Sequence, residues 1–141
     1  MIIFTKDIAE ALTAYLASKN YDKTYLVTDT NTRQHCLPLL EDTPALRDAG
    51  QITIEAGDVH KDIAQVAQIW HHLSDGGASR HSLLINLGGG MVTDLGGFAG
   101  ATFKRGLHVL NIPTTLMASV DAAVGGKTGI NFNGLKNEIG S

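Results

Sequence analysis

Residues 82–101 read SLLINLGGGMVTDLGGFAGA, and this stretch decides the fold. The apolar run over 82–87 predicts a strand buried on both faces, as in the middle of a parallel sheet. Three glycines follow, and the small residues after them predict a helix over 93–103 that lies close to the sheet or to a ligand. A glycine turn at the carboxyl end of a parallel strand lets a diphosphate meet backbone N–H groups and the positive end of the helix dipole. A tight turn with a small-residue packing face fits this stretch equally well, so the stretch alone leaves both interpretations open.

Strands and helices alternate along the remainder of the chain. Strands are expected at 2–4, 24–27, 51–55, 82–87 and 107–112. Helices are expected around 8–16 and at 32–40, 63–74, 93–103 and 115–123, with a short extended piece at 128–131. Because strands separated by helices form βαβ units, the sequence predicts one α/β domain over residues 1–141, with a Rossmann-like, mostly parallel sheet flanked by helices. The chain stops inside a glycine-rich segment at Ser141, so we expect a truncated part of a longer protein.

The composition narrows the function classes. The 141 residues are 43% hydrophobic, which is enough for a core, and the net charge of −3 comes with no stripe of Lys and Arg. Nucleic acid is therefore not an expected partner. No apolar run is long enough for a signal peptide or a membrane span, so a cytoplasmic protein with no membrane partner is expected. The one cysteine, Cys36, is expected to be a small hydrophobe near a helix, and the six histidines lack the spacing of metal ligands.

Two common phosphate-binding motifs are not met. In the dinucleotide fingerprint G-x-G-x-x-G, Gly88 and Gly90 fit the first two positions, but Thr93 stands at the third. The segment VGGKTG at 124–129 suggests a P-loop, yet that motif needs a glycine five residues before Gly126, where Asp121 stands. The turn after residue 87 is therefore interpreted as a different kind of phosphate turn.

Several polar residues are candidates for a site before any family is considered. Asp29 ends a strand, where a carboxylate either holds a ribose diol or caps the next helix. Asp94 lies in the first turn of the glycine-turn helix, where the helix dipole stabilises it and a bound nucleotide would be close. Asp58 and Lys61 flank the start of an amphipathic helix, with capping and solvation as the alternative. Cationic side chains in the glycine-rich stretch that follows suit a phosphate or carboxylate ligand; the polar residues there are Arg105, Asp121, Lys127, Lys136 and Asn137.

Three segments together resemble the 3-dehydroquinate synthase family. They read GGGMVTDLGGFAGATFKRG at 88–106, NIPTTLMASVDAAVGGKTGIN at 111–131 and GLKNEIG at 134–140. The family pattern has a triple glycine, an aspartate four residues later, Gly-Phe, Arg-Gly, Pro-Thr-Thr-Leu, Val-Asp, Val-Gly-Gly-Lys-Thr and Gly-Lys-Asn in this order. The resemblance is strong over 82–141 and weak over 24–75. It implies a dehydroquinate synthase-like N-terminal domain that binds NAD.

The resemblance assigns cofactor contacts residue by residue. Asp29 would contact the adenosine ribose, the glycine turn the pyrophosphate and nicotinamide, and two threonines would add hydroxyl contacts. Residues 57–61, Gly-Asp-Val-His-Lys, are similar to the family's Gly-Glu-x-x-Lys, with Asp58 in place of the usual glutamate. The implied cofactor-binding residues are Asp29, Asp58, Lys61, Gly89, Gly90, Met91, Val92, Thr93, Asp94, Thr114, Thr115, Lys127 and Lys136.

The resemblance also implies a catalytic set on the substrate side. Lys127 and Asn137 would hold the substrate phosphate, and Asp121 would lie by the reacting carbinol and the metal. Arg105 would serve the neighbouring subunit of a homodimer. The implied catalytic residues are Arg105, Asp121, Lys127, Lys136 and Asn137.

The reaction implied by the resemblance belongs to the shikimate pathway of aromatic amino acid biosynthesis. It converts a sugar-acid phosphate, 3-deoxy-D-arabino-heptulosonate 7-phosphate, into 3-dehydroquinate and phosphate. NAD takes up a hydride and returns it, and phosphate elimination and aldol closure occur around that cycle. A divalent metal, zinc or cobalt, would be held by one Glu and two His in a helical C-terminal domain that we expect to lie outside this chain. Residues 1–141 alone are therefore expected to be inactive.

Three other functions stay open from the sequence. A sister sugar-phosphate cyclase, such as a 2-deoxy-scyllo-inosose synthase, would share the fold, NAD and metal. A polyol dehydrogenase of the glycerol dehydrogenase type would release NADH. A non-catalytic nucleotide-binding module would bind the cofactor without turnover.

Overall fold

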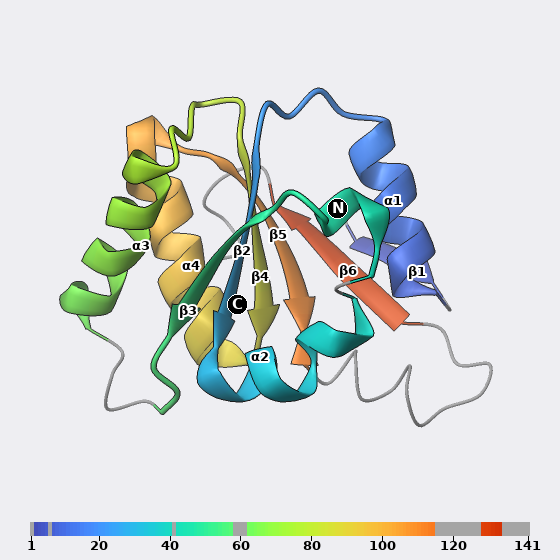
Figure 1. Cartoon of the computed structure of the whole chain (residues 1–141), viewed down its shortest axis with the longest axis horizontal. Coiled ribbons are helices and arrows are strands. Elements are labelled where there is room, and N and C mark those ends of the chain that lie inside the picture. The colour runs from blue at the N-terminus through green and yellow to red at the C-terminus, as the bar shows by residue number, and fades with distance from the viewer. Residues whose placement is uncertain (1, 6, 41, 58–61, 115–127, 134–141) are drawn as a thin grey trace.

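The computed structural model describes residues 2–5, 7–40, 42–57, 62–114 and 128–133. Its centre is a six-stranded sheet in the order β1-β6-β5-β4-β2-β3 (Figure 1). Strands β3, β2, β4 and β5 are parallel, whereas β6 pairs antiparallel with both β5 and β1. The predicted mostly parallel α/β sheet is thus confirmed. The strands are β1 (Ile2–Thr5), β2 (Thr24–Asp29), β3 (Gly50–Ile54), β4 (Leu83–Gly88), β5 (His108–Pro113) and β6 (Thr128–Asn133).

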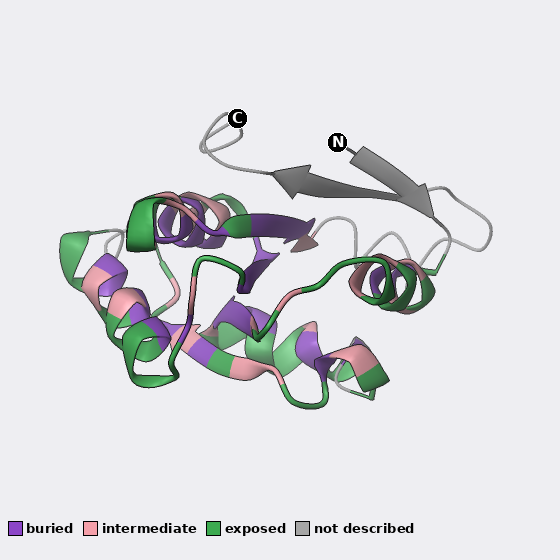
Figure 2. Ribbon diagram, turned by 90° about the horizontal axis from the view of Figure 1, so that it is seen from above, coloured by how far each residue is buried: buried purple, intermediate pink, exposed green. Residues whose placement is uncertain are grey.

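Helices cover both faces of the sheet. The α-helices are α1 (Ile8–Ala17), α2 (Thr30–His35), α3 (Ile63–Asp75) and α4 (Gly90–Thr102). One core cluster joins α1 and the segment after α2 to Leu26, Ile85 and Leu110, while the other joins α3 and α4 to Val27 and Leu84. Because side chains of a strand alternate between faces, adjacent residues of β4 enter opposite clusters. Figure 2 shows the buried positions on the strands and on the inward sides of the helices, with exposed positions outside.

Most predicted elements form, with shifts that have local causes. α2 begins at Thr30, two residues earlier than predicted, because Asp29 caps it, and it ends at His35, before Pro38. α4 begins at Gly90, three residues earlier than predicted, because the last of the three glycines already takes helical geometry while Gly89 before it is extended. The extended piece predicted at 128–131 is part of β6, whose antiparallel pairing the sequence did not indicate. The helix predicted at 115–123 lies outside the described residues.

Strands β4 and β2 are neighbours at the point where the chain reverses its path across the sheet. From β2 the chain passes through α2 to the edge strand β3, whereas from β4 it passes through α4 on the other face to β5. In open α/β sheets, the crevice beyond the carboxyl ends of two such strands is where ligands bind. In Figure 1 these carboxyl ends point toward α2. No helix in the part of the chain that the structure describes is long and apolar enough to cross a membrane.

Candidate nucleotide-binding site

The carboxyl edge of the sheet brings three sequence-predicted residues together. The register pairs Thr28 with Leu87 and Gly88 with Pro113, so Asp29 and Thr114 come level with the glycine turn from its two sides. A Cβ atom built on Gly89 would lie 3.6 Å from the Thr114 Oγ1 atom. The turn after β4 and the residue after β5 therefore line one space.

The start of α4 differs from the starts of the other three α-helices that the structure describes. Those helices begin after Asp7, Asp29 and Asp62, whose side chains accept a hydrogen bond from the backbone N–H three residues on, at 3.0, 2.7 and 3.1 Å. The residue before α4 is Gly89, which offers no side-chain cap. An uncapped helix start leaves its first N–H groups and its positive dipole end for another acceptor.

The turn that precedes the uncapped N–H groups is exposed. The first backbone hydrogen bond of α4 runs from the Thr93 N–H to the Gly89 carbonyl at 3.1 Å. The N–H groups of residues 90–92 therefore have no acceptor within the helix. Gly89 and Gly90 are exposed, and a Cβ atom on Gly90 would meet no atom of the described residues within 4 Å. This arrangement fits a phosphate group of a nucleotide.

Side chains at the start of α4 mostly serve the helix and the core. Val92 is fully buried and lies against Gly88, and Met91 packs against the same core cluster. The Thr93 hydroxyl donates to the carbonyls of Gly89 and Gly90 at 3.2 and 3.1 Å. Asp94 is half-buried one position further on. Met91 and Val92 can thus reach a ligand through their backbone rather than through their side chains.

Asp29 has a structural role that the sequence left open. Its Oδ1 atom accepts from the Thr32 N–H at 2.7 Å, and its own N–H donates to the Thr32 hydroxyl at 2.9 Å, which forms a reciprocal cap of α2. Burial, and then the negative charge of Asp29, raise the pKa of the Cys36 thiol. Cys36 packs against the core as a half-buried hydrophobe, as its sequence context predicts.

Arg105 lies far from the glycine turn of its own chain. It follows the C-terminal end of α4, whose 13 residues span ~20 Å at the rise of an α-helix. It precedes β5, so it is at the amino-terminal edge of the sheet, opposite to Gly89 and Thr114. Lys104 and Arg105 have φ angles of 46° and 70°, and Arg105 is exposed. Within its own chain Arg105 does not join this site, and its predicted role in a neighbouring subunit stays a prediction.

The remaining candidates cannot be placed. The family resemblance assigns them to the cofactor or the substrate, and these assignments stay predictions. Those outside the described residues are Asp58, Lys61, Thr115, Asp121, Lys127, Lys136 and Asn137. Among the residues that are described, no group of three or more His, Cys, Asp or Glu side chains could hold a metal ion.

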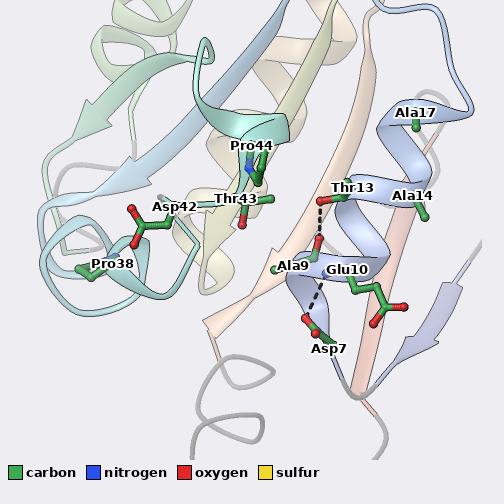
Figure 3. A pocket seen from close by; sticks show the side chains of 10 residues that line it. All are labelled: Asp7, Ala9, Glu10, Thr13, Ala14, Ala17, Pro38, Asp42, Thr43 and Pro44. Carbon is green, nitrogen blue, oxygen red and sulfur yellow. Dashed lines mark hydrogen bonds between the residues drawn. The ribbon is translucent and has the colours of Figure 1, made fainter.

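A cavity of about 610 Å³ lies elsewhere, between α1 and residues 38–44. Figure 3 shows α1 on one side of it and Pro38, Asp42 and Pro44 on the other. Among the described residues, its charged lining consists of the carboxylates of Asp7, Glu10 and Asp42. Because three negative charges repel a phosphate, this cavity is a poor nucleotide site in spite of its size.

Two buried polar residues lie behind the turn and were not predicted from the sequence. Asn86 interrupts the apolar run of β4 and Asn111 that of β5, and both side chains are buried. The Asn86 Nδ2 atom donates to the Asn111 Oδ1 atom at 3.0 Å. An asparagine at the same place in two apolar strands is the sequence signal that could have found them, because buried amides need partners.

A family model and individual relatives both indicate the same family for this chain. Residues 51–141 match the family model for the 3-dehydroquinate synthase N-terminal domain. A 3-dehydroquinate synthase of Parabacteroides distasonis is 62% identical over 140 residues, which cover 99% of this chain and 40% of the relative. One of Streptococcus equi subsp. equi is 38% identical over 140 residues, covering 99% of this chain and 39% of the relative.

Solved structures of sugar-phosphate cyclases share the fold. A 2-deoxy-scyllo-inosose synthase superposes with a TM-score of 0.68 at 18% identity, over 92% of this chain and 40% of that one. A 2-epi-5-epi-valiolone synthase from Streptomyces hygroscopicus subsp. jinggangensis 5008, solved with NAD+ and Zn2+ bound, gives a TM-score of 0.61 at 28% identity, over 91% and 36% of the two chains. The chain spans about 40% of the length of its curated relatives. It belongs to the 3-dehydroquinate synthase family and matches the N-terminal part of it.

Proposed function

We propose that this chain is the NAD-binding part of a 3-dehydroquinate synthase. The complete protein would convert 3-deoxy-D-arabino-heptulosonate 7-phosphate into 3-dehydroquinate and phosphate, with NAD and a divalent metal, zinc or cobalt. The observation that carries the proposal is the open helix start at Gly89, at the reversal point of the sheet, in a chain 62% identical to a 3-dehydroquinate synthase.

The described residues fit a dinucleotide at this place. The N–H groups of residues 90–92 would donate to a diphosphate oxygen, since Gly89 before them provides no side-chain cap. Thr114 would add its hydroxyl from the other side of the turn, close to Gly89. Asp29 uses one carboxylate oxygen to cap α2, and the other oxygen could accept from a ribose hydroxyl.

These residues would bind and orient, while the bound NAD supplies the redox chemistry by accepting a hydride from a carbinol carbon and returning it. The described residues include no metal-binding group, so we infer that the metal is held by residues outside them. Since Arg105 lies at the opposite edge of the sheet, its catalytic role would require a homodimer in which it enters the partner's site.

The test is turnover by the complete protein. With 3-deoxy-D-arabino-heptulosonate 7-phosphate, NAD and Zn2+ or Co2+, we expect phosphate release at a stoichiometry of one per 3-dehydroquinate, with no net NADH. Accumulation of NADH with a polyol substrate would support a dehydrogenase instead. Phosphate release only from a sugar phosphate that lacks the carboxylate would support a sister cyclase.

Binding of NAD is the second measurement. Calorimetry on the complete protein is expected to show one NAD per chain. A protein that binds no NAD at millimolar concentration would contradict the proposal. Residues 1–141 expressed alone are expected to bind NAD weakly and to release no phosphate.

A further inference from the structure

Two buried amides join β4 to β5 directly behind the glycine turn. Asn86 is fully buried and Asn111 is 6% exposed, and the register places them opposite each other. The Asn86 Nδ2 atom donates to the Asn111 Oδ1 atom at 3.0 Å. Apolar side chains at both positions would be the ordinary choice in parallel strands covered by a helix. The amide pair is therefore a feature that requires an explanation.

The other end of the Asn86 amide lies against α4. Among the described residues, the Asn86 Oδ1 atom has no hydrogen-bond partner. A Cβ atom built on Gly96 would lie 1.9 Å from this Oδ1 atom and 2.5 Å from the Cγ atom. No residue with a side chain fits at position 96 while this amide is in place. The Gly96 Cα–H group is instead close enough to be a weak donor to the orphaned oxygen.

These contacts join the three elements that carry the site. Asn86 lies two residues before Gly88 and Asn111 three residues before Thr114. Gly96 lies seven residues after Gly89, two turns along the same helix. The contact of the Asn86 amide with Gly96 limits the depth at which α4 packs on the sheet near the site, as the contact of Val109 with Gly100 does further along the helix. That depth decides where the first N–H groups of α4 lie relative to the Thr114 hydroxyl.

We propose that Asn86 is a positioning residue of the nucleotide site. Its amide holds β5 through Asn111 and sets the depth of α4 through Gly96, so that the turn and Thr114 face one ligand phosphate. This inference rests on the proposed NAD binding. Asn86 itself does not contact the ligand in this proposal. The amide at position 86 requires a glycine at position 96, because a side chain there would overlap the amide.

The stability test is a double-mutant cycle in the complete protein. Gly96→Ala places a methyl group on the amide and is expected to lower the melting temperature strongly. Asn86→Ala removes the amide, so the double variant N86A/G96A is expected to melt higher than Gly96→Ala alone. The matched control is Gly100→Ala in the same helix, whose Cβ atom would meet Val109 Cγ2 at 2.6 Å and not Asn86. Asn86→Ala is expected to give no such rescue of Gly100→Ala.

The functional test is NAD affinity well below the melting temperature of each variant. Asn86→Ala is expected to weaken NAD binding about tenfold, as loss of a residue supporting a ligand contact does. Ile85→Ala is the control for destabilisation alone, because Ile85 is the adjacent buried residue on the opposite face of β4. It is expected to leave the dissociation constant of NAD unchanged.

The outcomes separate the two proposals. Wild-type affinity in Asn86→Ala, or equal rescue of Gly96→Ala and Gly100→Ala, overturns the positioning role while NAD binding by the wild type upholds the proposed function. If the wild type binds no NAD, both fail. If Gly96→Ala does not fold, the double variant decides. A folded, NAD-binding N86A/G96A protein supports the inference. An unfolded double variant together with wild-type NAD affinity in Asn86→Ala overturns it.

Discussion

The two edges of the sheet differ in how their polar groups are hydrogen-bonded. At the carboxyl edge, α4 begins without a cap, and the glycine turn before it is exposed. At the amino edge, the Asp22 carboxylate accepts from the hydroxyls of Ser79 and Ser82, and the Lys23 ammonium donates to the Gly76 carbonyl at 2.7 Å. These amino-edge groups are thus bonded within the chain, whereas the first N–H groups of α4 at the carboxyl edge have no acceptor within their helix.

This difference shows that the fold gives up some helix stability at the proposed binding site. An uncapped helix start is less stable than one capped by Asp, and α1, α2 and α3 all have the Asp cap. Among the α-helices that the structure describes, the aspartate cap is thus missing at α4, which begins at the reversal point of the sheet. A ligand that carries its own negative oxygens restores what the cap would supply.

The largest expected effect comes from giving α4 the cap of its sister helices. Gly89→Asp fits the backbone, since φ is −85° and the nearest atom to its Cβ would be Thr114 Oγ1 at 3.6 Å. We expect the free energy of unfolding to rise by about a few tenths of a kcal/mol. NAD affinity is expected to fall about 100-fold, or ~2.7 kcal/mol, because the carboxylate takes the N–H donors and repels phosphate. Denaturation and calorimetry on the same samples check both signs.

Gly89→Asn is the control for charge. It offers the same cap with a similar size, so its stability should match that of Gly89→Asp. Its loss of NAD affinity should be clearly smaller. Equal NAD binding by the wild type and Gly89→Asp would contradict a phosphate at the start of α4.

The second effect separates the two roles of Asp29. Asp29→Asn keeps a good cap for α2, so stability should change little, while Asp29→Ala should cost ~1 kcal/mol. With the charge removed, NAD should bind about tenfold more weakly, as expected for loss of a charged hydrogen bond. NADP, whose 2′-phosphate the carboxylate repels, should bind relatively better. An unchanged ratio of NAD to NADP affinity would place the ribose elsewhere.

A smaller effect is expected from the hydroxyl across the turn. Thr114→Val keeps the shape and removes one neutral hydrogen bond, so NAD affinity should fall roughly fivefold, or ~1 kcal/mol. Thr102→Val is the matched control, because that hydroxyl donates to the Phe98 carbonyl at 2.7 Å at the far end of α4. Titration of both variants with NAD should separate them. Equal affinities would remove Thr114 from the site.

The sequence predicted the central parallel strands and the glycine turn because these depend on local pattern. A buried apolar run followed by glycines and small residues has few other solutions in a parallel sheet. It also predicted that Asp29 and the glycine turn follow parallel strands, whose carboxyl ends meet at one edge, while Thr114 was assigned to the site through the family resemblance. What it could not resolve was whether Asp29 caps a helix, because both roles use the same residue at the same position.

The unpredicted features depend on contacts between distant segments. The antiparallel position of β6 depends on its pairing with β5 and with β1, and β1 lies at the other end of the chain. The position of Arg105 follows from the length and direction of α4. Identifying Arg105 as a charged residue in the sequence does not give this position. The requirement for glycine at 96 follows from an amide ten residues earlier on another element.

The smallest effect on NAD is expected at the amino edge, where Asp22→Asn should leave the affinity unchanged. The Ser79 hydroxyl, and then that of Ser82, lower the pKa of Asp22 from its ordinary 3.8. A carboxyl group with a lowered folded-state pKa stabilises the fold above its unfolded pKa, and this stability is lost as the pH falls through the folded value. Asp22→Asn should therefore have a lower urea midpoint than the wild type at pH 7, with a difference that shrinks below 3.8. Ser82→Ala should lie between the two, and a difference that grows in acid would show that the carboxylate is not what holds this edge.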